Sequence, residues 1–440
     1  MRAADNELLT QVGPGTAMGK FMREYWVPAY MASEVEADKE PLRVKLLGEK
    51  LIGFKTAEGR YALMDHVCPH RCASLFFGRN EEEGIRCVYH GWKFDVDGQC
   101  VDMPSEPPET DFKHKVKVKA YPCIERGGMV WAYMGERETP PPLPLLNANR
   151  MPEDNRNIWA SLRECSWLQG LEGDIDTSHF GFLHAGGASL AQADSRNTQI
   201  MLTDKAPKYE VLDREYGTMY GAYRPADGDN TLWRVAQYLF PFWTMSPGSM
   251  MEEQLIARAW VPIDDENVMF YHFGKKGAGP SNNKIKGSKI HGMGGEVKLK
   301  PHDPTSWLGR FRLESNAGND YMIDRDVQQS KSYTGIDTGH IQDTMITESM
   351  TPISDRTKEQ LGTSDKMVSQ TRRRIIKAVK HYIKTGETPE SVHNPLIYHK
   401  VASGMMNLPN DADWLAQVAV KTDAMIEHYG LELKESEVTE

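Results

Sequence analysis

The 440-residue sequence lacks any run approaching the roughly 18 consecutive apolar residues of a membrane span. Its first residues are also too polar for a signal peptide. Basic residues are in the minority, 52 against 62 acidic ones, so the formal net charge is −10. Because nucleic acids and anionic membranes are themselves negative, we expect neither as a partner. A cytoplasmic protein is the remaining expectation.

Cysteine is also scarce, with six residues in the whole chain, which excludes a secreted disulfide scaffold. Three of the cysteines stand alone and are expected to pack as small hydrophobic residues: Cys100, Cys123 and Cys165. Cys68 and Cys87 differ, because a histidine follows each of them within three residues. Such pairs are candidate metal ligands.

The chain changes character near residue 140. Between about 40 and 135 it consists of short β-branched or aromatic segments broken by Gly, Pro and Asp, which predicts a small all-β domain. Thr139-Pro-Pro-Pro-Leu-Pro144 can continue neither a strand ladder nor a helix, so it marks a boundary. Strands followed by helices predict an α+β second domain with an antiparallel sheet. We therefore predict an α+β protein with domains at 1–145 and 146–440.

Several elements of the second domain can be placed. Strands are predicted at 209–223, 232–240, 254–261 and 268–273. One helix is predicted from a cap at Ser364 to about Lys384, with a stop at Gly386. Its apolar residues are expected to share one face: Val368, Ile375, Val379 and Ile383. A second helix is predicted at about 411–429.

Two lysine-rich segments have two interpretations each. Residues 275–304 hold seven lysines and many glycines, and form either a solvated loop or a docking surface or lid over a site. Residues 113–119 alternate lysine with other residues, which predicts a β-strand with one basic face. That face is either simply solvated or a place where a partner docks.

The first metal motif combines Cys68-Pro-His70 with Cys87-Val-Tyr-His90. Two thiolates and two imidazoles suit a tetrahedral zinc site, although zinc motifs usually have wider spacing within each pair. They also suit a [2Fe–2S] cluster in which cysteines hold one iron and histidines the other. The following Gly91-Trp92 favours the cluster, because glycine lets backbone amides approach and Trp shields the site from water.

With Met64-Asp65-His66 before it and Phe94-Asp-x-Asp-Gly98 after it, this motif resembles a Rieske domain. The resemblance implies that Cys68 and Cys87 bind one iron of the cluster, and that His70 and His90 bind the other. Cys72 departs from the family, where a glycine or another small or basic residue is common. It is expected to be an unpaired thiol.

The second motif is Asp176-x-x-His179-x-x-x-x-His184. Asp176 and His179 are three residues apart and would share a helix face. The two histidines are five apart, so a break at Gly181 is needed to bring both to one metal. Two nearby histidines are often ordinary core or surface residues. Two histidines with one carboxylate, however, suit non-haem Fe(II).

After a Rieske motif, this second motif, preceded by Glu172-x-x-x-Asp176, resembles the iron site of Rieske non-haem iron oxygenases. The resemblance implies a helix-grip catalytic domain and a mononuclear Fe(II) on His179 and His184. It also implies a homotrimer or stacked trimers (a hexamer). In that family an aspartate, here Asp176, is hydrogen-bonded to a histidine ligand of the iron. It also connects, across the trimer interface, to a cluster histidine of the neighbouring subunit, here His90.

The third iron ligand is expected to be Asp343, within His340-Ile-Gln-Asp343-Thr-Met, although other carboxylates compete: Asp324, Asp326 and Asp337. The motif from Gly15 to Pro28 and the segment 342–365 resemble oxygenase (alpha) subunits of the phthalate dioxygenase branch of this family. The match covers nearly the whole chain.

The resemblance implies an enzyme that uses O₂ to cis-dihydroxylate a phthalate-like aromatic carboxylate. The alternative is a monooxygenase or O-demethylase acting on a substituted benzoate. No Gly-x-Gly-x-x-Gly fingerprint and no plant-type ferredoxin cysteines occur, so electrons must come from a separate NAD(P)H-dependent reductase. A carboxylate needs a cation, for which four residues are candidates: Lys205, Lys208, Arg224 and Arg234. Three aromatic residues are candidate ring walls: Phe240, Phe242 and Trp243.

Overall fold

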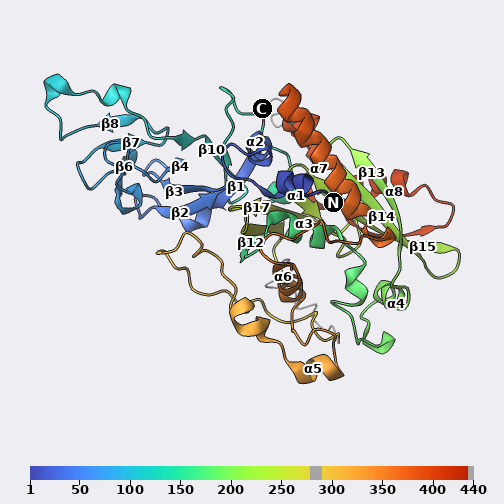
Figure 1. Cartoon of the computed structure of the whole chain (residues 1–440). Helices are drawn as coiled ribbons and strands as arrows, with labels where there is room; N and C mark the ends of the chain where they lie inside the picture. Colours follow the sequence, from blue (N-terminus) through green and yellow to red (C-terminus); the bar gives the residue numbers. More distant parts are fainter. Residues whose placement is uncertain (278–289, 435–440) are drawn as a thin grey trace.

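The second half of the chain is built around one eight-stranded antiparallel sheet (Figure 1). The computed structural model describes residues 1–277 and 290–434. The spatial strand order is β12-β18-β17-β16-β15-β14-β13, and β19 pairs with the same edge of β15 as β16 does. The bounds are β12 (Arg156–Arg163), β13 (Lys208–Arg214), β14 (Gly217–Pro225), β15 (Asn230–Leu239), β16 (Trp243–Met245), β17 (Ile256–Pro262), β18 (Val268–Lys275) and β19 (Gly404–Pro409).

Most of the predicted strands are confirmed, as β15, β17 and β18. The strand predicted at 209–223 is wrong as a single element, because a two-residue turn at Glu215 and Tyr216 folds it into the β13–β14 hairpin. Arg214 and Gly217 close that turn as a cross-strand pair. Hydrophobic alternation alone did not reveal the turn, because both residues are of types that strands tolerate.

The first half forms three small antiparallel sheets, as predicted for an all-β domain. One sheet contains β1 (Trp26–Met31), β11 (Met129–Tyr133) and β10 (Cys123–Arg126). The second contains β2 (Leu42–Leu46), β3 (Glu49–Lys55), β4 (Tyr61–Asp65) and β9 (Ala120–Tyr121). The third contains β5 (Arg79–Glu81), β6 (Gly84–Arg86), β7 (Lys93–Asp95) and β8 (Cys100–Asp102). The exact domain boundary at residue 145 stays a prediction.

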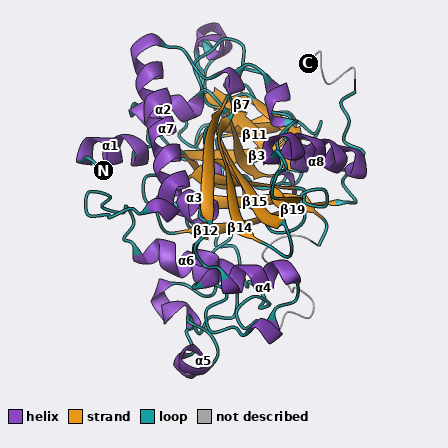
Figure 2. Ribbon diagram, turned by 90° about the vertical axis from the view of Figure 1, so that its right-hand side faces the viewer, coloured by secondary structure: helices purple, strands orange, loops and turns teal. Residues whose placement is uncertain are grey.

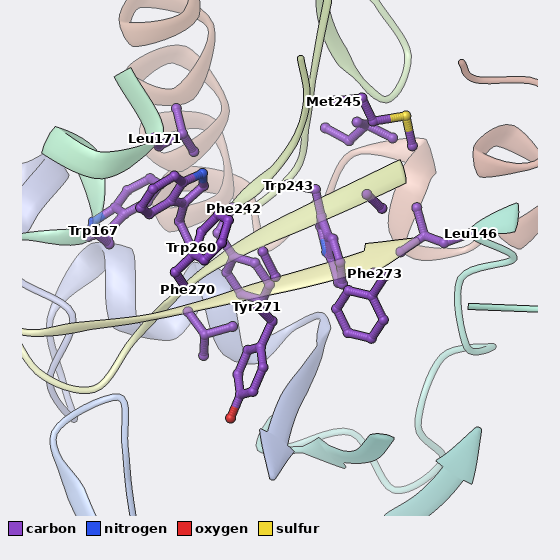
Figure 3. Close-up of a cluster of buried hydrophobic side chains, with 14 of the residues drawn as sticks. Leu146, Trp167, Leu171, Phe242, Trp243, Met245, Trp260, Phe270, Tyr271 and Phe273 are labelled. Atoms are coloured by element: carbon purple, nitrogen blue, oxygen red, sulfur yellow. The ribbon is translucent and has the colours of Figure 1, made fainter. Parts of the chain in front are cut away.

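Trp131 of β11 joins the two halves. Its ring stacks on Trp243 of β16 at 5.6 Å and on Phe273 of β18 at 6.2 Å. Trp243 and Phe273 belong to one face of the large sheet, where Figure 3 shows them side by side. The all-β domain therefore packs on that face of the large sheet. Along each strand, the residues that alternate with these point to the opposite face of the sheet.

Helices cover both faces of the large sheet, with α3 and α7 on one side and α8 on the other (Figure 2). Gly170 of α3 lies directly on Trp260, because a Cβ there would come within 2.3 Å of the ring. On the opposite face, Trp414 of α8 stacks on Trp233 at 4.8 Å. The bounds are α1 (Ala3–Thr10), α2 (Ala17–Arg23), α3 (Trp167–Ile175), α4 (Arg196–Thr203), α5 (Arg325–Ser330), α6 (Gly339–Ser349), α7 (Lys366–Thr385) and α8 (Trp414–Tyr429).

The two predicted C-terminal helices are confirmed as α7 and α8, with two corrections in α7. Ser364 is not its cap, because it lies in a separate 3-10 turn, Thr363–Asp365, and α7 begins after Asp365. Ile383 is 51% exposed, because the buried face of the helix ends at Val379. The stop at Gly386 is confirmed by its left-handed backbone, φ 76°.

The basic strand predicted at 113–119 is wrong. Lys113–Lys115 form a 3-10 turn, and Asp111 caps it by accepting from the Lys113 amide at 2.8 Å. This local side-chain bond competes with a strand, so the lysines do not line up on one face. Of segment 275–304, residues 278–289 lie outside the described part of the chain. Within the described ranges, no helix is both long and apolar enough to cross a membrane.

Candidate metal centres

Two loops of the all-β domain carry the cysteine motifs. The first follows β4 and the second joins β6 to β7. In each loop the amide four residues after the cysteine donates to the cysteine carbonyl, from Cys72 to Cys68 at 3.0 Å and from Gly91 to Cys87 at 2.9 Å. Both donors have left-handed backbone, with φ of 59° and 79°. The two loops thus form turns of the same type. The left-handed position is occupied by Gly91 in the second loop and by Cys72, an exposed free cysteine, in the first.

The side chains of these motifs meet as two pairs, cysteine with cysteine and histidine with histidine. Cys68 and Cys87 are buried, and the rings of His70 and His90 lie 4.4 Å apart. Burial, together with the Cys87 thiol, raises the pKa of Cys68 to about 11, so a bound cation is needed to keep Cys68 as a thiolate. His90 Nδ1 is buried and lacks a hydrogen-bond partner among the described residues. A buried nitrogen without a partner fits a metal ligand, so these residues fit a [2Fe–2S] cluster.

The second candidate centre lies in the α+β domain. His179 is on the 3-10 turn His179–Gly181, His184 follows, and Asp343 is on α6. His184 Nε2 lies 3.0 Å from His179 Nε2 and 3.2 Å from Asp343 Oδ1, and these ligand atoms all lie within 4.8 Å of one another. Such a set suits Fe(II). Within the described ranges, the competing carboxylates Asp324, Asp326 and Asp337 are not part of this group.

Asp176 does not share a helix with His179, contrary to the sequence expectation. Helix α3 ends at Ile175, because the Asp176 carboxylate accepts from the Ser178 amide at 2.8 Å and from its hydroxyl at 2.7 Å. Side-chain bonds of this kind compete with the helix. One break therefore lies before His179, where none was expected. The expected irregularity between the histidines is also present, because the 3-10 turn ends at Gly181 and the Ala185 amide donates to the Phe180 carbonyl five residues back. Asp176 Oδ2 lies 3.2 Å from His179 Nδ1.

Gln342 holds the other histidine, and the sequence did not single it out as a functional residue. His184 Nδ1 donates to Gln342 Oε1 at 2.7 Å. The Gln342 amide nitrogen donates to the Thr334 hydroxyl and the Ile336 carbonyl, both at 3.0 Å. With Nδ1 of both histidines engaged by oxygen atoms, each Nε2 is left for a metal. The available signal was the position of Gln342 directly before Asp343.

Asp343 is ionised in this arrangement. Burial by itself would disfavour its charge, but the His184 and His179 rings outweigh burial and hold the Asp343 pKa well below its usual range. Asp343 in turn raises the pKa of His184, although burial acts in the opposite direction. An ionised carboxylate beside two imidazole rings is a set of ligands that suits a divalent cation.

A cavity of about 780 Å³ opens beside the three ligands. It lies between the sheet face that carries Trp260 and the helices α3 and α6. Aromatic and aliphatic side chains form much of its wall, among them Phe180, Met201, Trp260, Phe270 and Met293. A cavity of this size, with both apolar walls and charged groups, suits an aromatic ring that bears polar substituents.

Arg234 lines this cavity, but the other three predicted cations do not. Lys208 is exposed on β13. Arg224 donates to the Asp204 carbonyl at 2.7 Å, and Lys205 lies over the Phe182 ring at 4.6 Å.

The aromatic walls predicted from the sequence are wrong. Phe240, Phe242 and Trp243 are buried in the core and are absent from the cavity wall. Trp243 points to the face of the sheet that meets the all-β domain, because side chains alternate along a strand. The sequence also does not show which face of the sheet meets the cavity. Three polar residues of that face were therefore missed, together with His340 of α6: Arg163, Arg258 and His272.

Comparison with known proteins agrees with both centres. The family model of the Rieske [2Fe–2S] domain matches residues 25–122, and the family model "LigXa C-terminal domain like" matches residues 132–438. The oxygenase subunit of 3-chlorobenzoate-3,4-dioxygenase from Comamonas testosteroni is 44% identical over 93% of this chain and 96% of its own. The oxygenase subunit of phthalate 4,5-dioxygenase from Pseudomonas putida is 35% identical over 93% of each chain.

The chain belongs to the Rieske non-haem iron oxygenases. Full-length similarity to oxygenase (alpha) subunits, in the branch that contains phthalate dioxygenase, confirms this resemblance and the enzyme class. The oxygenase has the expected fold as well: a dicamba monooxygenase structure has a TM-score of 0.56 at 17% identity, covering 83% of this chain and 99% of that one. The Rieske domain match and the His-His-Asp group support the two expected cofactors, a [2Fe–2S] cluster and a mononuclear iron.

Proposed function

We propose that this oxygenase cis-dihydroxylates an aromatic carboxylate with O₂. The observation that carries the proposal is the cavity, where the group of His179, His184 and Asp343 adjoins apolar walls and the buried guanidinium of Arg234. A ring that bears a carboxylate matches both features. Two full-length relatives are named for 3-chlorobenzoate and phthalate, which supports this substrate class.

Each centre has a defined set of proposed ligands. The cluster would be held by Cys68, His70, Cys87 and His90, and the iron by His179, His184 and Asp343. When bound, the cluster supplies electrons and the iron activates O₂ beside the substrate. Arg234 would orient the carboxylate, and Asp176 would keep His179 oriented and connect it to the neighbouring subunit's cluster loop.

We also propose a homotrimer, or stacked trimers, as the active form. The cluster loop exposes Val88 and Tyr89, which are 61% and 52% accessible. Near the iron loop, Phe182 and Tyr333 are 52% and 54% accessible, with ring centroids 6.2 Å apart. Two different exposed apolar patches on one chain suit head-to-tail contacts that close into a ring. Sedimentation tests this, because an active monomer would contradict it.

Electrons are proposed to come from a separate NAD(P)H-dependent reductase, and a cytoplasmic location follows from that partner. The described lysines of segment 275–304 stay a candidate docking surface. Two residues of the same segment, Ile290 and Met293, line the cavity, which supports the lid interpretation for that part.

The decisive experiment is a single turnover of the fully reduced holoenzyme in ¹⁸O₂, without reductase, on benzoates, phthalate isomers and methoxybenzoates. Two labelled oxygen atoms in one ring product support dihydroxylation. One labelled atom, or release of formaldehyde, indicates the alternative monooxygenase or O-demethylase. No product from any carboxylate, with both metals present, contradicts the substrate class.

A further inference from the structure

His272 on β18 belongs to the wall of the cavity and has no polar partner in the described part of the chain. It is 3% exposed and belongs to the cavity wall. Both ring nitrogens are buried without a hydrogen-bond partner among the described residues. A buried polar side chain usually has such a partner, because leaving it unpaired is unfavourable. A ligand in the cavity is therefore a candidate partner.

The groups beside His272 have other partners, although the Nε atom of Arg258 is buried without one among the described residues. Arg258, its cross-strand neighbour on β17, forms a salt bridge with Asp174. Trp159, its neighbour on β12, packs edge-on against His340, whose centroid is 4.9 Å away. Because Asp174 pairs with Arg258, that guanidinium is not an unpaired cation beside His272.

The neutral form of His272 defines the substituent that it can bind. Burial, assisted by the Arg258 guanidinium, lowers the pKa of His272 to about 3. A neutral imidazole offers one N–H donor and one acceptor nitrogen. A hydroxyl group complements it, since a hydroxyl both accepts and donates. A carboxylate offers acceptors only.

Arg234 on β15 provides a position of the opposite kind. It is 8% exposed, and two of its nitrogens, Nε and Nη1, have no partner in the described part of the chain. Its third nitrogen donates to the Pro247 carbonyl at 2.8 Å. A buried guanidinium stays charged, so one without a carboxylate partner favours an anionic ligand.

The two positions are well separated on one face of the sheet. The strands β16 and β17 lie between β15 and β18. In the strand register, His272 is level with Tyr238 of β15, four residues along the strand from Arg234. Three strand spacings across the sheet and four residues along it place the two backbones about 20 Å apart. Both side chains reach into the space between them, where a single aromatic ring can lie. Substituents on neighbouring ring carbons are too close together to contact both residues.

We propose that the substrate is an aromatic carboxylate with a hydroxyl group on the far side of the ring, where Arg234 binds the carboxylate and His272 binds the hydroxyl. This inference rests on the proposed function and narrows its substrate class. A hydroxyl in the meta or para position can reach His272, whereas an ortho hydroxyl stays beside Arg234. His272 then determines specificity.

Binding of benzoate and of 2-, 3- and 4-hydroxybenzoate to the oxidised holoenzyme, measured by calorimetry, tests this. We expect the better of the 3- and 4-isomers to bind roughly tenfold more tightly than benzoate, the gain from one buried hydrogen bond, and the 2-isomer to show no such gain. In His272→Phe, the ratio of the affinity for the better hydroxybenzoate to the affinity for benzoate should fall to about one. In His272→Asn, part of this preference should return.

Three controls make the result specific. Arg234→Met should weaken all four ligands by a similar factor, while Lys208→Met, an exposed residue outside the cavity, should change none. Cluster absorption and iron content show whether a variant is intact. If His272→Phe keeps the preference for the hydroxybenzoate over benzoate, the inference is wrong while the proposed function stands. The same holds if His272 strengthens binding of isophthalate or terephthalate but not of the hydroxybenzoates. If no benzoate binds to the wild type, both are wrong.

Discussion

Gln342 Oε1 accepts a hydrogen bond from His184 Nδ1 at 2.7 Å, directly beside the carboxylate of Asp343 on the same helix. Gln342 is fully buried, and its amide nitrogen is fixed by the Thr334 hydroxyl and the Ile336 carbonyl. The amide therefore cannot rotate freely, and its oxygen sets the orientation of the His184 ring. One turn of α6 thus supplies a metal ligand and the residue that positions another.

Replacing Gln342 with Ala should weaken iron binding by about 10- to 100-fold, because His184 loses its orienting acceptor. Iron retention during dialysis against a chelator measures this. Cluster absorption should be unchanged. The matched control is Gln370→Ala, a half-buried glutamine on α7 that bonds Asp213 and not a metal ligand, which should retain iron like the wild type. Equal retention by both variants would show that Gln342 has no positioning role.

His179→Ala should remove the mononuclear iron and leave the cluster intact. The two centres use different residues on different domains, and the substitution deletes one of three clustered ligands. Metal analysis and visible absorption of the same sample check both parts. Bleaching of the cluster would mean that the assignment of two independent centres is wrong.

Asp176→Asn should retain both metals and slow turnover, by at least about 10- to 100-fold, the range for loss of a partner of a metal ligand. The amide preserves the shape of the turn at Ser178 but removes the negative charge beside His179. Single-turnover product yield and the rate of cluster oxidation measure the effect. Normal turnover would refute a role for this carboxylate.

Gly170→Ala should destabilise the catalytic domain by about 1–3 kcal/mol, because the added methyl group overlaps the Trp260 ring. Gly173→Ala is the matched control on the same helix, where a Cβ meets only the Thr347 methyl group at 3.5 Å. In that variant, stability should stay equal or rise by about 0.5–1 kcal/mol, because alanine favours a helix. Thermal unfolding of both proteins separates the steric effect from helix propensity.

Glu172 should make the fold sensitive to acid. Burial disfavours its charge, but Arg356 and Arg372 outweigh burial and lower its pKa. A lowered pKa in the folded state stabilises the fold above the unfolded value of about 4.3, and this contribution is lost as the pH falls further. Unfolding measured between about pH 7 and 3 should show a smaller pH dependence in Glu172→Gln. That variant should also be less stable at neutral pH by about 3–5 kcal/mol.

Candidate ligands for both centres could be named from the sequence because most of each motif is local. The pairs at Cys68 and Cys87 and the pair at His179 are readable from spacing, and the resemblance to one family brought in the distant Asp343. The end of α3 was missed, because the Asp176 side chain competes with the helix for backbone amides. His272 was missed, because alternation shows which residues share a face and not what lies opposite.

The stacking of Trp131 on Trp243 has a consequence for how the redox centres communicate. The domain with the cluster loops packs on one face of the large sheet, and the cavity lies on the other. Within one chain the sheet therefore separates the cluster loops from the cavity, and the proposed trimer would instead bring the cluster loop of one subunit to the iron loop of the next. Turnover per chain should therefore fall on dilution below the assembly concentration, even when substrate, O₂ and reductant are saturating.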